Sequence, residues 1–360
     1  KMLSLELKSD MLPHKVDVPT EHPIVQVSAG DSHAAALDSH GNVFYWGTFI
    51  SQAGEDFQLQ PGKRFGWLPE KIPGVNEKIV KIASGEHHII LLSKLGRIYS
   101  LGAGEVGTLG RPLSTRKYLE AKLTAGLVHC KPAYDIYCGQ FSNFAFTKQG
   151  VYTWGLNNHG QLCLPMPPAE KEDQSVKRPT KSESLSKLNP MKIAAGLHHN
   201  LIMDSEGKLL SNGIVTFGRL GRSDVEDIKN NTEKIEPAPV NGLEGVKIVD
   251  CAVSEATSTA VGSKPGEIFA WGFSKTSQLG KEGYDLPHQK LPEKMHIPED
   301  SFLHKASVMK IQMGASHAMM LVEDQNLNNN SDAEKNNSAA DNTSQNQTDT
   351  SQNQTAAAET

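Results

Sequence analysis

Apolar and polar positions follow a pattern along this chain that recurs six times. Each copy has an apolar segment ending at a small residue and glycine, a short polar step, a second apolar segment, a turn, and a third segment that usually closes on an aromatic residue or leucine before glycine. Segments rich in β-branched and aromatic residues, bounded by glycine turns such as 38–41, predict strands joined as hairpins. No long segment keeps the apolar period of a helix uninterrupted, which disfavours a helical repeat.

The glycine after the first segment marks the spacing of the copies. A second glycine signal and a proline-containing segment such as 68–73 follow in several copies, which brings each copy to four strands. The anchor positions lie about 54 to 61 residues apart, a period typical of blade-like repeats. Four-stranded units that repeat radially form a β-propeller, in which each sheet packs against two neighbours. The anchors are Gly30, Gly85, Gly139, Gly196, Val253 and Gly314.

The two ends of the chain do not match a whole repeat. The first residues belong to a copy already under way, and the sixth copy stops after its first strand. We therefore expect the chain to lack about one N-terminal repeat, and its sixth blade to be completed by strands from the other terminus. After Val322 the residues Asn, Gln, Ser, Thr and Ala dominate, which favours disorder. The sequence predicts an all-β propeller over 1–322 and a disordered acidic tail over 323–360.

Composition narrows the class of protein. The 360 residues include 31 glycines and carry a formal charge of −5, and seven acids but one base lie between 323 and 360. The rest of the chain is nearly neutral, which argues against a strongly basic nucleic-acid binder but leaves a local basic patch open. No apolar stretch approaches the ~18 residues of a membrane helix.

The four cysteines lack C-x-x-C spacing, which predicts free, buried thiols in a reducing compartment.

Histidines recur in the Gly-x-x-His step, and two interpretations stay open for each: the imidazole bonds a neighbouring blade, or it faces a ligand. For His33 the structural interpretation is favoured. The pairs His87-His88 and His198-His199 do not predict a metal site, because adjacent strand residues point to opposite faces and no carboxylate or cysteine completes a chelate. No G-x-S-x-G nucleophile motif occurs. The sequence therefore predicts neither a metal nor a cofactor.

Whole phrases are more specific than the repeat alone. They are Val27–His33 followed by Trp46–Phe49, Gly196–His199 followed by Met203–Lys208, and Gly314–His317 before the last apolar run. In this order along the chain they resemble the regulator of chromosome condensation family, the nuclear exchange factors for the small GTPase Ran.

The resemblance covers roughly residues 10–322. It implies a seven-bladed β-propeller whose first repeat is missing here. It further implies a nuclear, chromatin-bound protein that accelerates GDP release from Ran without covalent chemistry. Ran and chromatin are the partners it suggests, and no membrane contact is expected.

Nucleotide exchange sets a physical requirement. A small GTPase holds its nucleotide with backbone amides, a lysine and Mg²⁺, so a factor that expels it must offer competing charge and deform the phosphate loop. The resemblance implies that a polar rim of Asp31, Glu86, His198 and His317 does this, together with a wedge inserted after residues 46–47. The residues expected at the wedge are Ser51, Gln52, Ala53, Gly54, Glu55 and Asp56.

Two positions depart from the family pattern. His87 stands where the family has an acid in the second copy, with Glu86 one place earlier. Ile50 and Ser51 replace a basic-acidic pair expected after Phe49. Either Glu86 substitutes for the missing acid, or exchange is slowed and the surface binds differently.

Basic segments give a weaker indication. A loop after the second copy lies where the family contacts DNA phosphates, a contact that would be sequence-independent and salt-sensitive. A solvated loop without this role is the alternative. Lys177, Arg178 and Lys181 fall in an insertion over 165–190 that we interpret as a linker or targeting patch. The candidate chromatin-binding residues of the first loop are Arg111, Arg116 and Lys117, with Lys122 beyond them.

Two hypotheses of different class follow. The first is an exchange factor for Ran on chromatin, which depends on the ordered phrases and the insertion. The second is a propeller scaffold of the same repeat superfamily that binds another protein without exchange activity, which the replaced acid and altered wedge favour.

Overall fold

The computed structural model describes residues 14–51, 54, 56–57, 66–113, 122–166, 173–225, 236–274, 279 and 288–323. Five antiparallel sheets of four strands follow one another along the chain, as the repeat predicted. In order, they are β1 (Ile24–Ala29), β2 (His33–Asp38), β3 (Val43–Gly47) and β6 (Gly66–Lys71); β7 (Ile79–Ser84), β8 (His88–Ser93), β9 (Ile98–Gly102) and β10 (Gly126–Val128); β11 (Ala133–Cys138), β12 (Ser142–Thr147), β13 (Gly150–Leu156) and β14 (Ser175–Ser182); β15 (Lys192–Ala195), β16 (His199–Met203), β17 (Leu209–Gly213) and β18 (Ala238–Pro239); and β19 (Ile248–Val253), β20 (Thr257–Gly262), β21 (Ile268–Phe273) and β22 (His288–Lys294).

Two smaller sheets and three short helices complete the described part of the chain. β23 (Ser307–Met313) and β24 (Ala318–Glu323) form a sixth, two-stranded sheet, and β4 (Phe49–Ile50) pairs with β5 (Asp56–Phe57). The helices are α3 (Glu183–Leu188) and the 3₁₀ turns η1 (Thr216–Gly218) and η2 (Phe302–His304). In the segments described here, no helix is long and apolar enough to cross a membrane.

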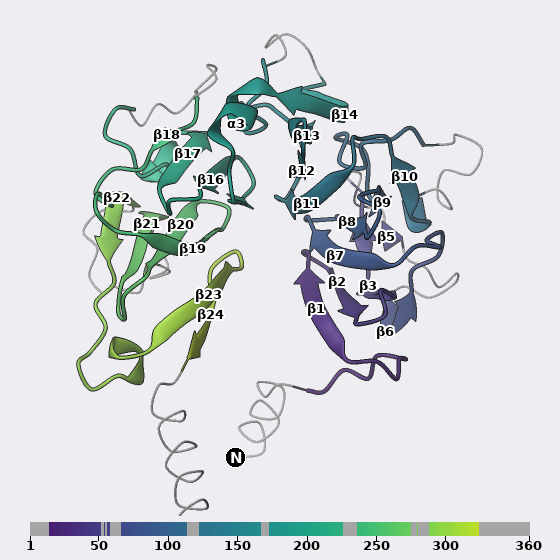
Figure 1. The fold of residues 1–360 in the computed structure, drawn as a ribbon, viewed down its shortest axis with the longest axis horizontal. Coiled ribbons are helices and arrows are strands. Elements are labelled where there is room, and N and C mark those ends of the chain that lie inside the picture. The colour runs from purple at the N-terminus through teal and green to yellow at the C-terminus, as the bar shows by residue number, and fades with distance from the viewer. Residues whose placement is uncertain are drawn as a thin grey trace, which may run out of the picture.

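The six sheets stand side by side around a common centre, with β1, β7, β11, β15, β19 and β23 innermost (Figure 1). This arrangement confirms the predicted all-β propeller. The first sheet and the two-stranded sixth sheet face each other across an opening (Figure 1). There Val27 is 70% exposed, whereas the equivalent Ile82 and Ile136 in the next two sheets are buried against a neighbour. The number of blades and the missing repeat stay predictions.

The anchor glycines let consecutive sheets approach closely. A Cβ on Gly30 would lie 2.4 Å from the carbonyl oxygen of Gly85, and one on Gly196 would lie 2.5 Å from that of Ser254. Both distances are far below a carbon–oxygen contact, so a larger residue would push two blades apart. The requirement for glycine is therefore set by packing between blades.

The anchor of the fifth copy was assigned one residue too early. The amide of Ser254 donates to the carbonyl of Thr257 at 2.8 Å, and the amide of Gly85 donates in the same way to His88. Ser254, and not Val253, therefore occupies the anchor position. Because Ser254 stands where the repeat pattern has glycine, the pattern was matched to the preceding residue, Val253.

Side chains of one sheet bond to a loop carbonyl of the sheet before it. The carbonyl oxygen of Thr108 accepts from Asn143 Nδ2 at 3.0 Å and from Trp154 Nε1 at 2.9 Å. Between the fourth and fifth sheets the carbonyl oxygen of Arg219 accepts from Ser258 Oγ and Trp271 Nε1. Both indoles are fully buried, so each fills the space between two sheets and also satisfies a buried carbonyl.

A second set of contacts joins the innermost strands. Lys81 forms an ion pair with Asp135, and Lys192 forms one with Asp250. The second carboxylate oxygen of Asp250 accepts from the amide of Ile311 at 2.9 Å, so this aspartate connects the fourth, fifth and sixth sheets.

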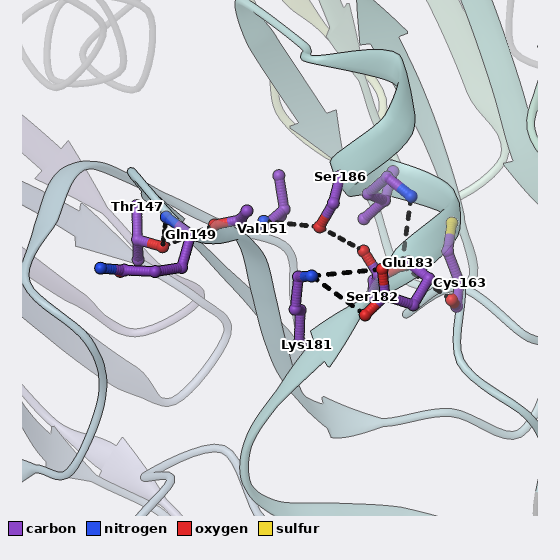
Figure 2. Close-up of polar contacts among 10 residues, drawn as sticks. Thr147, Gln149, Val151, Cys163, Lys181, Ser182, Glu183 and Ser186 are labelled. Atoms are coloured by element: carbon purple, nitrogen blue, oxygen red, sulfur yellow. Dashed lines mark hydrogen bonds and ion pairs between the residues drawn. The ribbon is translucent and has the colours of Figure 1, made fainter.

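The insertion over 165–190 is structured in part, which corrects its interpretation as a linker, while its role as a targeting patch stays a prediction. Residues 175–182 form β14, the fourth strand of the third sheet, and Ser182 caps α3 by accepting from the amide of Leu185 (Figure 2). The Ser182 hydroxyl donates to the carbonyl of Cys163, and Ser186 accepts from the amide of Val151 (Figure 2). Lys177 pairs with Asp173 and Lys181 with Glu183, so both lysines have acidic partners.

The cysteines are free thiols, as the sequence predicted. Cys163 and Cys251 are buried, while Cys130 and Cys138 are only partly covered as whole residues. Burial raises the pKa of Cys251 to about 12 and that of Cys130 to about 11. Both thiols therefore stay neutral and unreactive at physiological pH.

The acidic tail lies outside the described residues from 324 on, and Glu323 belongs to β24, so the tail begins at least one residue later than predicted.

Candidate rim site

Turns between the first and second strand of each sheet form a continuous rim at one end of the propeller. The amide of Asp31 donates to the carbonyl of Glu86 at 3.0 Å, and the amide of Glu86 donates to that of Gln140 at 2.9 Å. These bonds run from one sheet to the next. They hold Asp31 and Glu86, which directly follow their anchors, at one level of the rim. Glu255 directly follows the anchor Ser254 and so has the equivalent position in the fifth sheet.

The three carboxylates at these positions interact. Burial raises the pKa of Glu86, and the negative charges of Asp31 and Glu255 raise it further. The rim is therefore a region of negative potential that favours a cation or a proton. The sequence analysis missed Glu255, because the fifth anchor was placed at Val253; counting from Ser254 would have found it.

A cavity of about 240 Å³ opens beside Glu86. Its walls include Ser51, His87 and Glu105 together with the apolar Ile50 and Phe141. His87 Nε2 lies 3.5 Å from a Glu86 carboxylate oxygen, and burial lowers the pKa of His87. The cavity thus combines acidic groups with an imidazole that is mainly neutral near pH 7.

Glu105 is held in place by a buried lysine. Lys122 Nζ lies 2.5 Å from its carboxylate, and the lysine side chain is almost fully covered. The sequence analysis grouped Lys122 with the basic loop, but its charge is directed into the protein.

His198 and His317 differ in their surroundings. The His198 ring is packed edge-on against His159, with centroids 4.6 Å apart, and burial lowers its pKa to about 4. His317 is exposed on the sixth sheet and follows its anchor by three residues, in the register of His88 and His199. The structure therefore places His198 on the rim and His317 at a position that elsewhere makes contacts between blades.

The candidate wedge coincides with the β4–β5 hairpin. Phe49 pairs with Phe57 and Ile50 with Asp56. Ser51, the first residue of the connecting turn, is buried and lines the cavity, so it does not protrude as a tip. Gly54 has a φ of +76° and no atom within 4 Å of a built Cβ, as expected at the apex of a turn. Gln52, Ala53 and Glu55 lie outside the described residues.

Arg111 has a structural role within the second sheet. Its guanidinium donates to the Ser100 hydroxyl and to the carbonyls of Ser100 and Thr124, all at 3.1 Å. These bonds occupy the group that phosphate binding would need. Arg116 and Lys117 lie outside the described residues, and their role in chromatin binding stays a prediction.

Two of the remaining histidines bond across blades, which confirms the structural interpretation for them. His88 Nε2 lies 2.8 Å from Asn143 Oδ1, and His199 Nε2 lies 2.9 Å from Ser258 Oγ. His33 has the same register, but Ile89 occupies the partner position, so its ring packs against Phe49 instead. Cys138 lies 3.8 Å from His88 Nε2, yet burial raises the pKa of the thiol, so this Cys–His–Asn cluster has no nucleophile.

These neutral histidines predict a pH dependence of stability. The pKa of His88 falls from 6.5 to about 4 and that of His33 from 6.5 to about 3, mainly through burial. Below pH 6.5 the unfolded chain gains protons that the folded chain does not, so stability falls as the pH drops toward 4. We expect the midpoint of urea unfolding to decrease over this range, and the decrease to be smaller for His88→Gln. Equal slopes for both proteins would contradict this.

An exposed aromatic residue adds to the rim near His198. Phe217 in η1 has a φ of +63°, a left-handed conformation that bulky residues rarely adopt. Its ring packs on Phe273 and beneath the Arg219 guanidinium. Strain of this kind concentrates at functional sites. No sequence pattern marked Phe217, because its conformation is set by contacts with residues far along the chain.

Among the residues whose placement is described, no cluster of three or more metal-binding side chains occurs. The candidate site therefore consists of an acidic rim, a small cavity and an adjacent hairpin on a propeller.

Comparison with known proteins identifies the family of this chain. The model of the RCC1-like domain matches residues 5–327, and the chain belongs to this family. It is 34% identical over 332 residues to "Regulator of chromosome condensation" of Homo sapiens, which covers 88% of this chain and 74% of that protein. It is 30% identical over 273 residues to "Guanine nucleotide exchange factor SRM1" of Saccharomyces cerevisiae, covering 72% and 55%. The crystal structure of Prp20p from Saccharomyces cerevisiae superposes with a TM-score of 0.73 at 24% identity, covering 88% and 73%.

Proposed function

We propose that this protein promotes GDP release from the small GTPase Ran. The observation that supports this best is the acidic rim, where backbone bonds hold Asp31 and Glu86 at one level and burial destabilises the charge of Glu86. A rigid acidic surface competes for the lysine and Mg²⁺ that hold a nucleotide in a GTPase. Relatives named as exchange factors are consistent with this proposal.

The hairpin next to the rim supplies a second element. β4–β5 adjoins the cavity through Ile50 and Ser51, so a phosphate loop that meets Glu86 lies within reach of this hairpin. By linkage, a factor that binds the nucleotide-free GTPase more tightly than the loaded form weakens nucleotide binding by the same factor. We further propose that the protein acts in the nucleus on chromatin; Prp20p is described with its binding properties to Gsp1p and histones.

The direct test measures release of fluorescent GDP from Ran with the 360-residue chain. We expect acceleration by the parent protein and at least a tenfold loss in Asp31→Asn, because removing one charge from a preorganised contact typically costs more than about 1.4 kcal/mol. Glu206→Gln, an exposed substitution in the turn before β17, is the matched control and should retain full activity. Unaltered exchange by Asp31→Asn would remove the rim from the mechanism.

A scaffold function without exchange is the second candidate. His87 on the cavity wall, whose pKa burial lowers, supports it, because the family resemblance implies an acid at this position. A folded parent protein that binds Ran or another partner without releasing GDP would establish this alternative.

A further inference from the structure

The end of the propeller opposite the rim carries a ring of exposed apolar side chains. In each sheet the residue five places before the anchor is a large apolar residue, and all six are between 41% and 61% exposed. In five of the six it occupies the bulge where the register of the innermost strand shifts. The ring consists of Val25, Val80, Tyr134, Met191, Val249 and Met309.

The ring is a repeated feature of the fold. The next residue along each strand is polar, and these side chains bond between sheets, as in the ion pairs of Lys81 with Asp135 and Lys192 with Asp250. Each bulge therefore places two kinds of residue next to each other: a polar residue that contacts the neighbouring blade, and an apolar residue that makes no such contact.

Lysines accompany the ring. Lys78, Lys131, Lys247 and Lys305 precede their ring residues by two to four positions, and all are exposed. Among the residues that the structure places, none of these four has an ion-pair partner. A positive border around an apolar centre is complementary to an acidic surface that presents an apolar group.

We propose that this ring binds a partner protein through an acidic segment that inserts a bulky apolar side chain. The chain's own tail leaves the propeller at this end, since Glu323 pairs with Ser307 at the start of β23. The tail over 324–360 holds six acids but only one large apolar residue, Leu327, so it matches the lysines and not the ring. The proposed partner segment combines acidic residues with a bulky apolar side chain, which this tail does not.

The test selects binders from a displayed library of random 12-residue peptides on the immobilised 360-residue protein. We expect enrichment of Asp and Glu around Leu, Phe or Trp. Fluorescence anisotropy of the enriched peptide should show at least tenfold weaker binding to the triple variant Val80→Thr, Met191→Gln, Val249→Thr. Lys78→Gln with Lys247→Gln should weaken binding several-fold and reduce its dependence on salt.

Matched controls separate the ring from other exposed apolar residues. Leu68→Gln with Leu127→Gln, on the outermost strands, should bind the peptide like the parent. The ring variant should release GDP from Ran at the parent's rate, so this proposal and the exchange function fail separately. Urea unfolding at the parent midpoint shows that each variant is folded.

Four results would overturn the proposal. They are no enrichment of acidic–apolar peptides, equal weakening by the control variant, a ring variant that changes self-association in sedimentation, and binding that appears only after the tail acids are neutralised. A change in self-association would assign the ring to a contact with a second copy of this chain. Binding that needs neutral tail acids would assign it to the chain's own tail.

Discussion

Asp250→Ala is expected to destabilise the propeller by about 3–5 kcal/mol, the usual cost of leaving one partner of a buried ion pair alone. Lys192 would keep its charge with the carbonyl of Cys251 as its remaining contact, and the amide of Ile311 would lose its acceptor. Since the Asp250 side chain is only 9% exposed, water can replace little of either interaction.

Chemical denaturation followed by tryptophan fluorescence measures this effect. Asp250→Asn is the informative control, because its amide oxygen can still accept from Ile311 while the charge is lost, and it should recover part of the stability. The double variant Asp250→Ala, Lys192→Met should also recover part, since an apolar replacement removes the stranded charge. A loss below about 1 kcal/mol would show that the pair behaves like an exposed one.

Trp154→Ala is expected to cost about 3–5 kcal/mol, because it removes a fully buried indole and leaves a cavity between the second and third sheets. The substitution also removes one of the two donors to the carbonyl of Thr108, leaving Asn143. Trp154→Phe separates the two contributions, since it keeps most of the apolar volume and loses the hydrogen bond, and it should cost about 1 kcal/mol from that bond. If Trp154→Ala and Trp154→Phe lost similar stability, the removed apolar volume would not be the main cause of the loss.

The repeat pattern was sufficient to predict the sheets, because period-two alternation and glycine turns report directly on strands and hairpins. It predicted four strands for each repeat, but it ended the sixth copy after its first strand, whereas β24 (Ala318–Glu323) adds a second strand to that sheet. The fifth anchor was wrong by one residue, since Ser254 lacks the glycine signal. The strand over 175–182 was missed because Lys, Arg and Pro dominate an outer strand that faces solvent.

The site was predictable in part. Asp31, Glu86 and His198 lie on the rim, because a residue's distance from its anchor fixes its place on a turn. Ser51 was expected at a protruding tip and is buried at the start of the hairpin's turn, and Arg111 was expected to face phosphate and instead bonds backbone carbonyls. Such outcomes depend on contacts between residues far apart in the chain, which repeat spacing does not encode.

Among the described residues, the junction between the first and second sheets shows no counterpart of the loop contact that Asn143 and Trp154 make. Ile89 and Leu101 stand where the third sheet has Asn143 and Trp154, and they pack with Phe49 in an apolar cluster. The innermost strands of the same two sheets are nevertheless bonded, with Gln26 donating to and accepting from the backbone of Ile82. Hydrogen bonds have a directional requirement, whereas apolar contacts have none. The orientation of the first sheet, and of the β4–β5 hairpin that follows it, is therefore set by bonds at the centre of the propeller.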